Sequence, residues 1–419
     1  MPAEPSAEKG GRTMSAFPTT AGFTPSRRPV PPYPAQHFDV VILSARYGAG
    51  HWQAAAAVRE AMAALFPGRE PLLLDYMDLV NPALNRTIQS LYLASIKHFP
   101  GGYGWFYRTT STIPPDSPFQ SLLNSLGREQ LARLVEATTP RAILSTFPTQ
   151  AGVLSDMRRL GQCAIPTLTV ITDNTVHSQW VHPHTDLYCV SSAAVAGHLA
   201  SRGVPPERIA TTGIPIRQAF SHPIDPVEVR RRYRFDPELP IVLVMSGAFG
   251  ALGGVSEACR ILTHMNRPLQ MVVVAGRDRQ LVRRLQRGVR QYPYPVHVFG
   301  YVEFIAELMA SASVLVTKAG GVTTAEALAM GLPVIIFRPI PGQEEANADY
   351  LCEHGAAMSA RSTEELRVAC DRLLGDDGLR AAMRRASLQL GRPHAARDVA
   401  RLALQLGGIA AYAPSEPRA

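Results

Sequence analysis

Residues 313–337 read SVLVTKAGGVTTAEALAMGLPVIIF. The run Ser313–Val316 has the length of a buried strand, and the paired glycines Gly320 and Gly321 form a turn before an alanine-rich segment. A second apolar run, Pro333–Phe337, follows that segment. Strand, glycine turn, helix and strand in this order predict a parallel α/β sheet in which an anion such as phosphate would sit at the start of the helix.

The same strand-loop-helix pattern occurs on both sides of a stretch with several prolines, residues 212–240. Further strands are predicted at His37–Ser44, Pro71–Leu74, Ala142–Ser145, Leu168–Thr172, Leu187–Val190, Ile241–Met245, Gln270–Ala275 and Val296–Phe299, and helices over residues 362–411. We therefore expect an α/β protein with two Rossmann-like, doubly wound domains facing a central cleft. The expected divisions are a disordered tail (1–36), an N-terminal domain (37–225), a C-terminal domain (226–395) and a final helix and tail (396–419).

Composition excludes several classes of protein. The chain has 419 residues, of which 46% are hydrophobic and 18% charged, unlike a disordered or coiled-coil chain. No apolar run approaches the roughly 18–20 residues that span a bilayer. The five cysteines form no C-x-x-C pair, so neither a disulfide framework nor a zinc site is indicated, and a cytoplasmic location is expected.

The net charge of +8 favours an anionic partner. No zinc-finger, RRM, KH or basic-zipper pattern is present, so nucleic acid is not an expected partner. Six arginines in Arg277–Arg290 form either a solvated helix face or a surface that an anionic membrane would attract. The aromatic and basic residues of Asn85–Pro115, Trp105 among them, are typical of a surface that touches lipid, or else of a folded aromatic minicore.

A glycine loop, Tyr47-Gly48-Ala49-Gly50-His51, separates the first predicted strand from the helix predicted over Trp52–Leu65. With a pKa near neutrality, His51 could accept a proton from a hydroxyl; alternatively it caps the helix or satisfies local hydrogen bonds. A second glycine loop, Ser246–Gly254, also follows a strand. Its backbone N–H groups could hold a diphosphate, or its glycines only permit a tight turn.

Polar residues follow other predicted strands. Glu326 lies early in the helix after Gly321 and could accept hydrogen bonds from a sugar diol, or only complement the helix dipole. A loop that offers Gln343, Glu344 and Asn347 would suit a hydroxyl-rich ligand. A polar cluster follows another predicted strand and is made of Thr172, Asp173, Asn174, His177, Trp180, His182 and His184. Its histidine spacing lacks a carboxylate pattern for metal, so orientation of an acceptor is the preferred interpretation.

Taken together and in order, these motifs resemble the processive diacylglycerol glycosyltransferases and monogalactosyldiacylglycerol synthases of glycosyltransferase family 28. The resemblance covers roughly residues 38–375. The segments that carry it are Gly48–His51, Asn81-Pro82, Thr172-Asp173, His177 to Pro183, Thr212–Arg217, Val274–Arg277, Phe299–Val302, Lys318–Thr323, Glu326 and Pro341–Asn347.

The resemblance implies a GT-B fold and an inverting transfer of glucose or galactose from a UDP-sugar to diacylglycerol, with no obligatory metal or other cofactor. It implies that the enzyme is peripheral on the cytoplasmic face of the membrane. His51 would be the catalytic residue. The backbone at Tyr301–Val302 would hold uracil, Glu326 the ribose, Gly320–Thr323 the diphosphate, and Gln343 and Glu344 the sugar.

The full set of donor-side residues implied is Gly247, Phe249, Arg277, Tyr301, Val302, Lys318, Gly320, Gly321, Thr323, Glu326, Gln343, Glu344 and Asn347. The acceptor-side residues implied are Gly50, Trp105, Asp173, His177, Trp180 and His182. Two alternatives stay open: transfer of N-acetylglucosamine to a polyprenyl-diphosphate precursor of peptidoglycan, and a nucleotide-sugar-binding protein without catalysis. The sequence leaves open the choice between glucose and galactose, the number of sugars added, the exact lipid and the oligomeric state.

Overall fold

A computed structural model describes residues 36–47, 49–98, 109–110, 117, 124–247, 254–289 and 292–409. For residues 84 and 92–98 it describes the backbone only. The predicted tail, residues 1–36, lies outside the described residues except for its last position.

Within the described residues, the first sheet contains six parallel strands in the order β2-β1-β3-β4-β5-β6. Its strands are β1 (Val40–Ser44), β2 (Leu72–Asp75), β3 (Ala142–Ser145), β4 (Thr167–Val170), β5 (Leu187–Val190) and β6 (Ile209–Thr211). The predicted parallel arrangement is confirmed. Because β1 has β2 on one side and β3 on the other, the strand order reverses at β1, which is where parallel sheets bind ligands.

The second sheet, again counted over the described part of the chain, has six parallel strands in the order β12-β11-β10-β7-β8-β9. Its strands are β7 (Ile241–Met245), β8 (Gln270–Val274), β9 (Val296–Phe299), β10 (Val314–Thr317), β11 (Val334–Phe337) and β12 (Ala357–Ala360). Here the order reverses at β7, between β8 and β10. The quoted stretch therefore contributes β10 and β11, next to this reversal.

Two edge strands were missing from the sequence-based prediction. In β6 no residue is buried, and Thr211 is exposed. Strand β12 reads Ala-Met-Ser-Ala and has only its two alanines buried. Both lack the continuous run of large apolar residues that marks a strand buried on both faces. Pairing with a neighbouring strand, rather than local sequence, defines them.

Helices connect the strands and cover the sheets. The helices that accompany the first sheet are α1 (Gly50–Leu65), α2 (Tyr76–Val80), α3 (Pro82–His98), α6 (Arg128–Thr138), α7 (Pro148–Arg159) and α8 (Ala193–Ala200). Those that follow along the chain are α9 (Pro226–Tyr233), α10 (Val255–Thr263), α11 (Arg279–Gly288), α12 (Ile305–Ser311), α13 (Gly321–Ala329), α14 (Gln343–Glu353), α15 (Thr363–Gly375), α16 (Asp377–Leu390) and α17 (Ala395–Leu406). Short 3₁₀ turns occur at Ser178–Trp180, Pro206–Arg208 and Gln218–Ser221.

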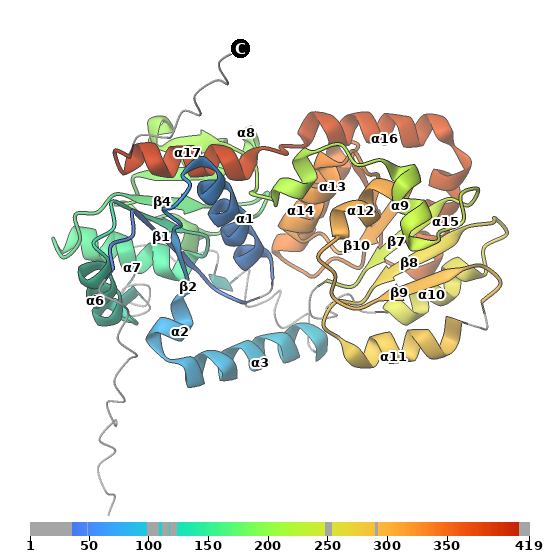
Figure 1. Ribbon diagram of the computed structural model, residues 1–419, viewed down its shortest axis with the longest axis horizontal. Helices are drawn as coiled ribbons and strands as arrows, with labels where there is room; N and C mark the ends of the chain where they lie inside the picture. Colours follow the sequence, from blue (N-terminus) through green and yellow to red (C-terminus); the bar gives the residue numbers. More distant parts are fainter. Residues whose placement is uncertain are drawn as a thin grey trace, which may run out of the picture. The chain divides into compact units, whose positions relative to one another are not determined.

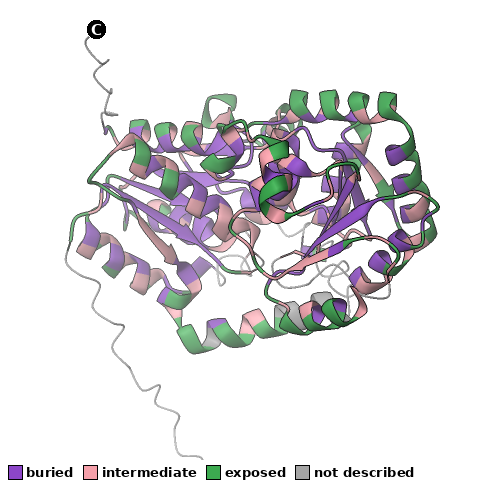
Figure 2. Cartoon of the chain, turned by 45° about the vertical axis from the view of Figure 1, so that its right-hand side comes forward, coloured by how far each residue is buried: buried purple, intermediate pink, exposed green. Residues whose placement is uncertain are grey.

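Apolar residues are buried on both faces of each sheet, as expected for parallel sheets covered by helices. In β1, Val40 and Ile42 belong to one hydrophobic cluster, whereas Val41 and Leu43 belong to another. The same alternation divides β7 between two clusters. Figure 2 shows the strands as buried and the outer sides of the helices as exposed.

The last helix, α17, returns to the first sheet. Val399, Ala403 and Leu404 are buried in the same cluster as Val40 and Ile42 of β1. Figure 1 shows α17 beside α1, which it contacts. Helix α17 therefore helps to cover the first sheet. The domain divisions expected from the sequence stay a prediction.

Packing of α17 can be tested with Leu404→Ala, which removes a side chain that is 3% exposed. We expect the free energy of unfolding to fall by about 2–5 kcal/mol, the usual cost of truncating a buried leucine. Gln405→Ala, at an exposed position of the same helix, should change it by less than about 0.5 kcal/mol. Urea unfolding followed by circular dichroism measures both; equal values for the two variants would mean that α17 does not cover the sheet in solution.

Candidate active site

One pocket is lined by residues that follow strands of both sheets. The residues that line it are Tyr47, Ala49, Gly50, His51, Thr172, Asp173, Lys318, Gly320, Gly321, Val322, Ile340, Gln343 and Glu344. They follow β1 and β4 in the first sheet and β10 and β11 in the second. The pocket thus lies at the carboxyl ends of the strands, where ligands bind in doubly wound sheets.

His51 is the second residue of α1, which begins two residues before the predicted start of the helix. Its Nδ1 lies 2.9 Å from the Thr172 hydroxyl oxygen. The Thr146 hydroxyl contacts the His51 backbone carbonyl at 3.1 Å. The side chain is therefore held by a residue that follows β4, and its backbone by a residue that follows β3.

Aromatic rings enclose the His51 imidazole. The Phe147 ring meets it edge-on at a centroid distance of 4.9 Å, and the Trp180 ring lies at 6.0 Å. Burial lowers the pKa of His51 to about 4, although a hydrogen bond to the Thr146 backbone acts in the opposite direction. The imidazole is therefore neutral at pH 7. When Nδ1 carries the proton and donates it to Thr172, Nε2 keeps its lone pair and can accept a proton.

Helices α1 and α13 both begin at this pocket without a capping side chain. Their N-cap residues, Ala49 and Gly320, provide no side-chain hydrogen bond, and neither helix has an acidic residue in its first turn. The two helix starts lie close together, because a Cβ on Gly50 would be 3.8 Å from Val322 Cγ2. Free backbone N–H groups and two positive dipole ends therefore favour an anion here.

Helix α14 also begins at the pocket, but acidic side chains in its first turn already neutralise the positive end of its dipole. The Glu345 carboxylate accepts a hydrogen bond from the backbone N–H of Gly342 at 3.1 Å, and Glu344 lies in the same turn. An anion is thus disfavoured at α14 and favoured at α1 and α13. Glu344 also binds the Lys318 ammonium and accepts the Ile340 N–H at 3.1 Å, so the loop before α14 is tied to the loop after β10.

Asn347 joins the two sets of loops. Its Nδ2 donates to Asp173 Oδ1 at 3.1 Å and to the Ala319 carbonyl at 3.0 Å, and its Oδ1 accepts the Asn174 N–H at 2.7 Å. Burial raises the pKa of Asp173 to about 6; the Asn347 hydrogen bond and the charge of Lys318 lower it, and the charge of Glu344 raises it. Asp173 therefore titrates close to physiological pH.

Glu326 of α13 is buried and is not one of the residues that line this pocket. Burial raises its pKa to about 7, and the nearby Arg217 acts in the opposite direction. The Arg217 Nε is itself buried without a hydrogen-bond partner in the described part of the chain. A carboxyl group poised between its protonated and charged forms can both donate and accept hydrogen bonds.

Other predicted donor-side residues lie at the carboxyl ends of β7, β8 and β9. Tyr301 is 45% exposed, and the Arg277 guanidinium lies 5.2 Å from its ring centroid. Both line a separate pocket with Arg279 and Arg283. Gly247 has a φ of +76°, and a Cβ there would be 3.2 Å from Lys318 Cε. Val302 is half-buried. Thr323, another predicted donor-side residue, lies elsewhere, in the first turn of α13 after β10.

Predicted acceptor-side residues divide between the pocket and the interior. Gly50 and Asp173 line the pocket, and Trp180 packs close to His51. His177 is buried, with its Nε2 3.3 Å from the Thr110 hydroxyl. His182 is buried too; burial lowers its pKa to about 4, and its Nε2 has no hydrogen-bond partner among the described residues.

Two predicted site residues, Trp105 and Phe249, lie outside the described residues, as do residues 99–108 and 111–115 of the aromatic stretch. Conversely, the prediction omitted Thr172 and Tyr47, which line the pocket. The sequence placed Thr172 at the end of a predicted strand and in the polar cluster beside it, but gave it no role at the site. Its hydrogen bond to His51 joins residues 121 positions apart, so no local pattern in the sequence could reveal it.

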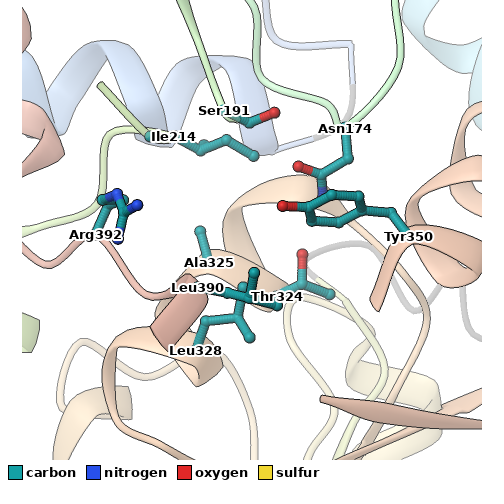
Figure 3. Close-up of a pocket in the computed structure, with 10 residues that line it drawn as sticks. Asn174, Ser191, Ile214, Thr324, Ala325, Leu328, Tyr350, Leu390 and Arg392 are labelled. Atoms are coloured by element: carbon teal, nitrogen blue, oxygen red, sulfur yellow. The ribbon is translucent and has the colours of Figure 1, made fainter. Parts of the chain in front are cut away.

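A second pocket is lined by residues that follow strands of both sheets, but neither His51 nor the first residues of α1 and α13 line it. Figure 3 shows Asn174, Ser191 and Ile214 on one side of it, and Thr324 with Leu328 on the other. The Thr324 hydroxyl already donates within its own helix, to Gly320 or Gly321. Without a group that could accept a proton from a substrate at neutral pH, this pocket is not the candidate active site.

Within the described ranges, no group of three or more His, Cys, Asp and Glu residues could hold a metal ion. No described helix combines the length and apolar character needed to cross a membrane.

The contact between Thr172 and Gly321 can be tested with Gly321→Ala. A Cβ on Gly321 would lie 2.0 Å from the Thr172 carbonyl oxygen, so the backbone of one segment must move. We expect the free energy of unfolding to fall by about 1–3 kcal/mol, as in overpacked sites. The matched control is Gly320→Ala, where a Cβ would meet nothing within 4 Å. Urea unfolding compares the two; an unchanged Gly321→Ala variant would contradict the close contact.

The protonation state of His51 can be measured by NMR titration of the imidazole signals, with His51→Ala identifying its resonances. With a pKa of about 4, His51 should stay neutral from pH 8 to about pH 5. Because unfolded chains bind this proton at higher pH, the burial of His51 should lower the stability as pH falls from about 6.5 to 4. Titration of the His51 signals near pH 6.5 would contradict a buried, neutral imidazole.

Known proteins resemble this chain in sequence over most of its length. A family model described as monogalactosyldiacylglycerol (MGDG) synthase matches residues 51–216, and one described as glycosyl transferases group 1 matches residues 229–389. A processive diacylglycerol beta-glucosyltransferase of Bacillus licheniformis is 35% identical over 339 residues, which cover 81% of this chain and 87% of the relative.

Solved structures with low sequence identity share the fold. MurG of Acinetobacter baumannii has a TM-score of 0.60 and 18% identity, over 88% of this chain and 99% of that chain. A structure of S. aureus MnaA with UDP has a TM-score of 0.59 and 16% identity, over 89% of this chain and 98% of that chain. These similarities, with the two parallel sheets, confirm the predicted GT-B fold. The identity and coverage of the Bacillus relative show that the chain belongs to the family of the processive diacylglycerol glycosyltransferases.

Proposed function

We propose that this protein transfers a hexose from a UDP-sugar to the free hydroxyl of diacylglycerol and so makes a membrane glycolipid. The family of the chain supports this reaction, and one structural observation carries it. The neutral His51 imidazole, with Nδ1 directed to Thr172, lines the same pocket as the uncapped starts of α1 and α13. A base for a hydroxyl and a site for an anion are the two groups that such a transfer needs.

In the proposed reaction the diacylglycerol oxygen attacks the anomeric carbon of the sugar from the side opposite UDP. A carbon–oxygen bond to the lipid forms while the bond from the anomeric carbon to the phosphate oxygen breaks. The hydroxyl proton passes to His51 Nε2, and UDP leaves with the electron pair of the broken bond. The configuration at the anomeric carbon is thereby inverted.

Charge in the pocket supports the departure of UDP. The start of α13 would hold the diphosphate through the N–H groups between Gly320 and Thr323, with the Lys318 ammonium beside them. These groups supply positive potential where negative charge develops. We therefore propose a reaction without an obligatory metal or cofactor.

The remaining donor contacts are proposed from the family resemblance and from position. Uracil would lie against the backbone at Tyr301–Val302, and the ribose diol at Glu326, whose near-neutral pKa suits hydroxyl groups. Gln343 and Glu344, at the start of α14, would contact the sugar. The neutralised start of α14 supports this division, because a sugar is uncharged and a diphosphate is not.

We further propose that the enzyme acts in the cytoplasm, bound peripherally to the membrane that holds its lipid. Exposed arginines on α11, among them Arg283, Arg284 and Arg287, offer a basic face for anionic lipid headgroups. The buried Leu281 and Leu285 fix α11 to the body of the protein, so that its basic face points outward.

The substrates can be tested by incubating the purified full-length protein with diacylglycerol in phosphatidylcholine vesicles and UDP-glucose, UDP-galactose or UDP-N-acetylglucosamine. Mass spectrometry of the extracted lipids should reveal hexosyl-diacylglycerol. His51→Ala should lower kcat by about 10²–10⁴-fold, because it removes the base, while calorimetry should still detect UDP binding. His198→Ala, at an exposed position of α8, is the matched control and should keep the rate.

Two outcomes would overturn the proposed reaction, and a third would overturn the assignment of the base. Transfer only of N-acetylglucosamine, and only to a polyprenyl-diphosphate acceptor, would establish the peptidoglycan-precursor alternative. UDP binding without product from any donor and acceptor pair would indicate a binding protein. Full turnover by a folded His51→Ala variant would remove the assignment of the base.

A further inference from the structure

The segment Thr172–Asn174 is held at several points by residues that belong to the second sheet and its helices. The Thr172 carbonyl lies so close to Gly321 that a Cβ there would be 2.0 Å away. Asn347 binds the next two residues, through Asp173 Oδ1 at 3.1 Å and the Asn174 N–H at 2.7 Å. This short segment at the end of β4 is therefore fixed from the donor side of the pocket.

The Asn347 amide is fully used in these contacts. The side chain is completely buried, with 0% exposure. Its two N–H groups have the acceptors Asp173 Oδ1 and the Ala319 carbonyl, and its oxygen accepts the Asn174 N–H. A buried amide with all its donors satisfied has none left for a sugar hydroxyl. Its chemistry therefore suits structural support better than direct contact with the donor.

The same segment carries the residue that orients the proposed base. Thr172 Oγ1 lies 2.9 Å from His51 Nδ1, and Thr172 is the direct chain neighbour of Asp173. A shift of Asp173 and Asn174 would therefore move the Thr172 hydroxyl relative to the imidazole. The path from Asn347 to His51 consists of two hydrogen-bonded steps and one short stretch of backbone.

We propose that Asn347 is a positioning residue, which links α14 of the donor side to the Thr172–Asn174 segment and thereby holds the His51 imidazole with Nε2 free for the acceptor hydroxyl. The inference rests on the proposed function of His51. It assigns Asn347 a role through Asp173, Asn174 and Thr172 instead of the donor contact expected from the sequence.

The surroundings of the link explain why a neutral amide suits this position. Asp173 already has the Glu344 carboxylate as a like-charged neighbour and the Lys318 ammonium as an opposite one. Figure 3 shows that the Asn174 side chain lies beside Tyr350, in a pocket that His51 does not line. An aspartate at position 347 would face Asp173 and the Ala319 carbonyl with no proton to donate.

The test compares Asn347→Ala and Asn347→Asp with Gln53→Ala. Gln53 donates to the Tyr301 hydroxyl at 3.4 Å, a contact between the same two parts of the protein that does not involve Thr172. We expect both Asn347 variants to lower kcat by up to about 100-fold, as for a misplaced catalytic group, with KM for the UDP-sugar changed by less than about threefold. Gln53→Ala should keep kcat within about twofold.

A double-mutant cycle with Thr172→Val tests whether Asn347 acts through Thr172. If it does, the double variant Asn347→Ala/Thr172→Val should be no slower than the slower single variant by more than about twofold, because coupled residues are non-additive. Multiplied effects of the two substitutions, or equal losses in kcat and in the amount of folded protein, would overturn the proposal.

Histidine NMR provides a readout that needs no substrate. In the wild-type protein His51 should carry its proton on Nδ1, whereas in Asn347→Ala, with Thr172 displaced, it should show a mixture of the Nδ1-H and Nε2-H tautomers. An unchanged His51 signal in a folded Asn347→Ala variant would overturn the inference. Because this measurement does not depend on turnover, it separates the failure of the inference from that of the proposed lipid reaction.

Discussion

The close approach of the Thr172–Asn174 segment to α13 and α14 is the contact on which the rest of the site depends. Gly321 permits it because it has no Cβ to meet the Thr172 carbonyl, and Asn347 secures it with hydrogen bonds to Asp173 and Asn174. Through this contact, residues after β4 and residues after β10 line one pocket. Neither sheet alone would bring His51 of α1 next to the start of α13.

Burial and helix ends determine the chemistry of that pocket. Loss of water around His51 keeps its imidazole neutral, and loss of water around Asp173 and Glu326 raises the pKa of each carboxyl into the range of physiological pH. The bare starts of α1 and α13 favour a negative group, whereas the acidic first turn of α14 does not. In the proposed function, this difference between the first turns separates the place for a diphosphate from the place for an uncharged sugar.

Much of the fold could be predicted from local patterns. The ranges Ala142–Ser145, Leu187–Val190, Ile241–Met245 and Val296–Phe299 were assigned as strands and occur as such, because their sequences are nearly continuous apolar runs. Edge strands β6 and β12 were missed, since each is partly exposed and lacks such a run. The glycine turns before α1 and α13 were recognised, and with them His51 and Gly321, because a strand, a glycine turn and a helix are contiguous in the sequence.

The sequence by itself thus determined the α/β class, the two parallel sheets, the family and the position of the histidine at a helix start. Tertiary structure alone decided that Thr172 contacts this histidine and that the Asn347 amide forms hydrogen bonds with Asp173 and Asn174. It also decided that α17 returns to cover the first sheet. The reason is physical. Periodicity and turn chemistry act over a few residues, whereas Asn347 and Asp173 are 174 positions apart and meet only when both sheets have folded and packed.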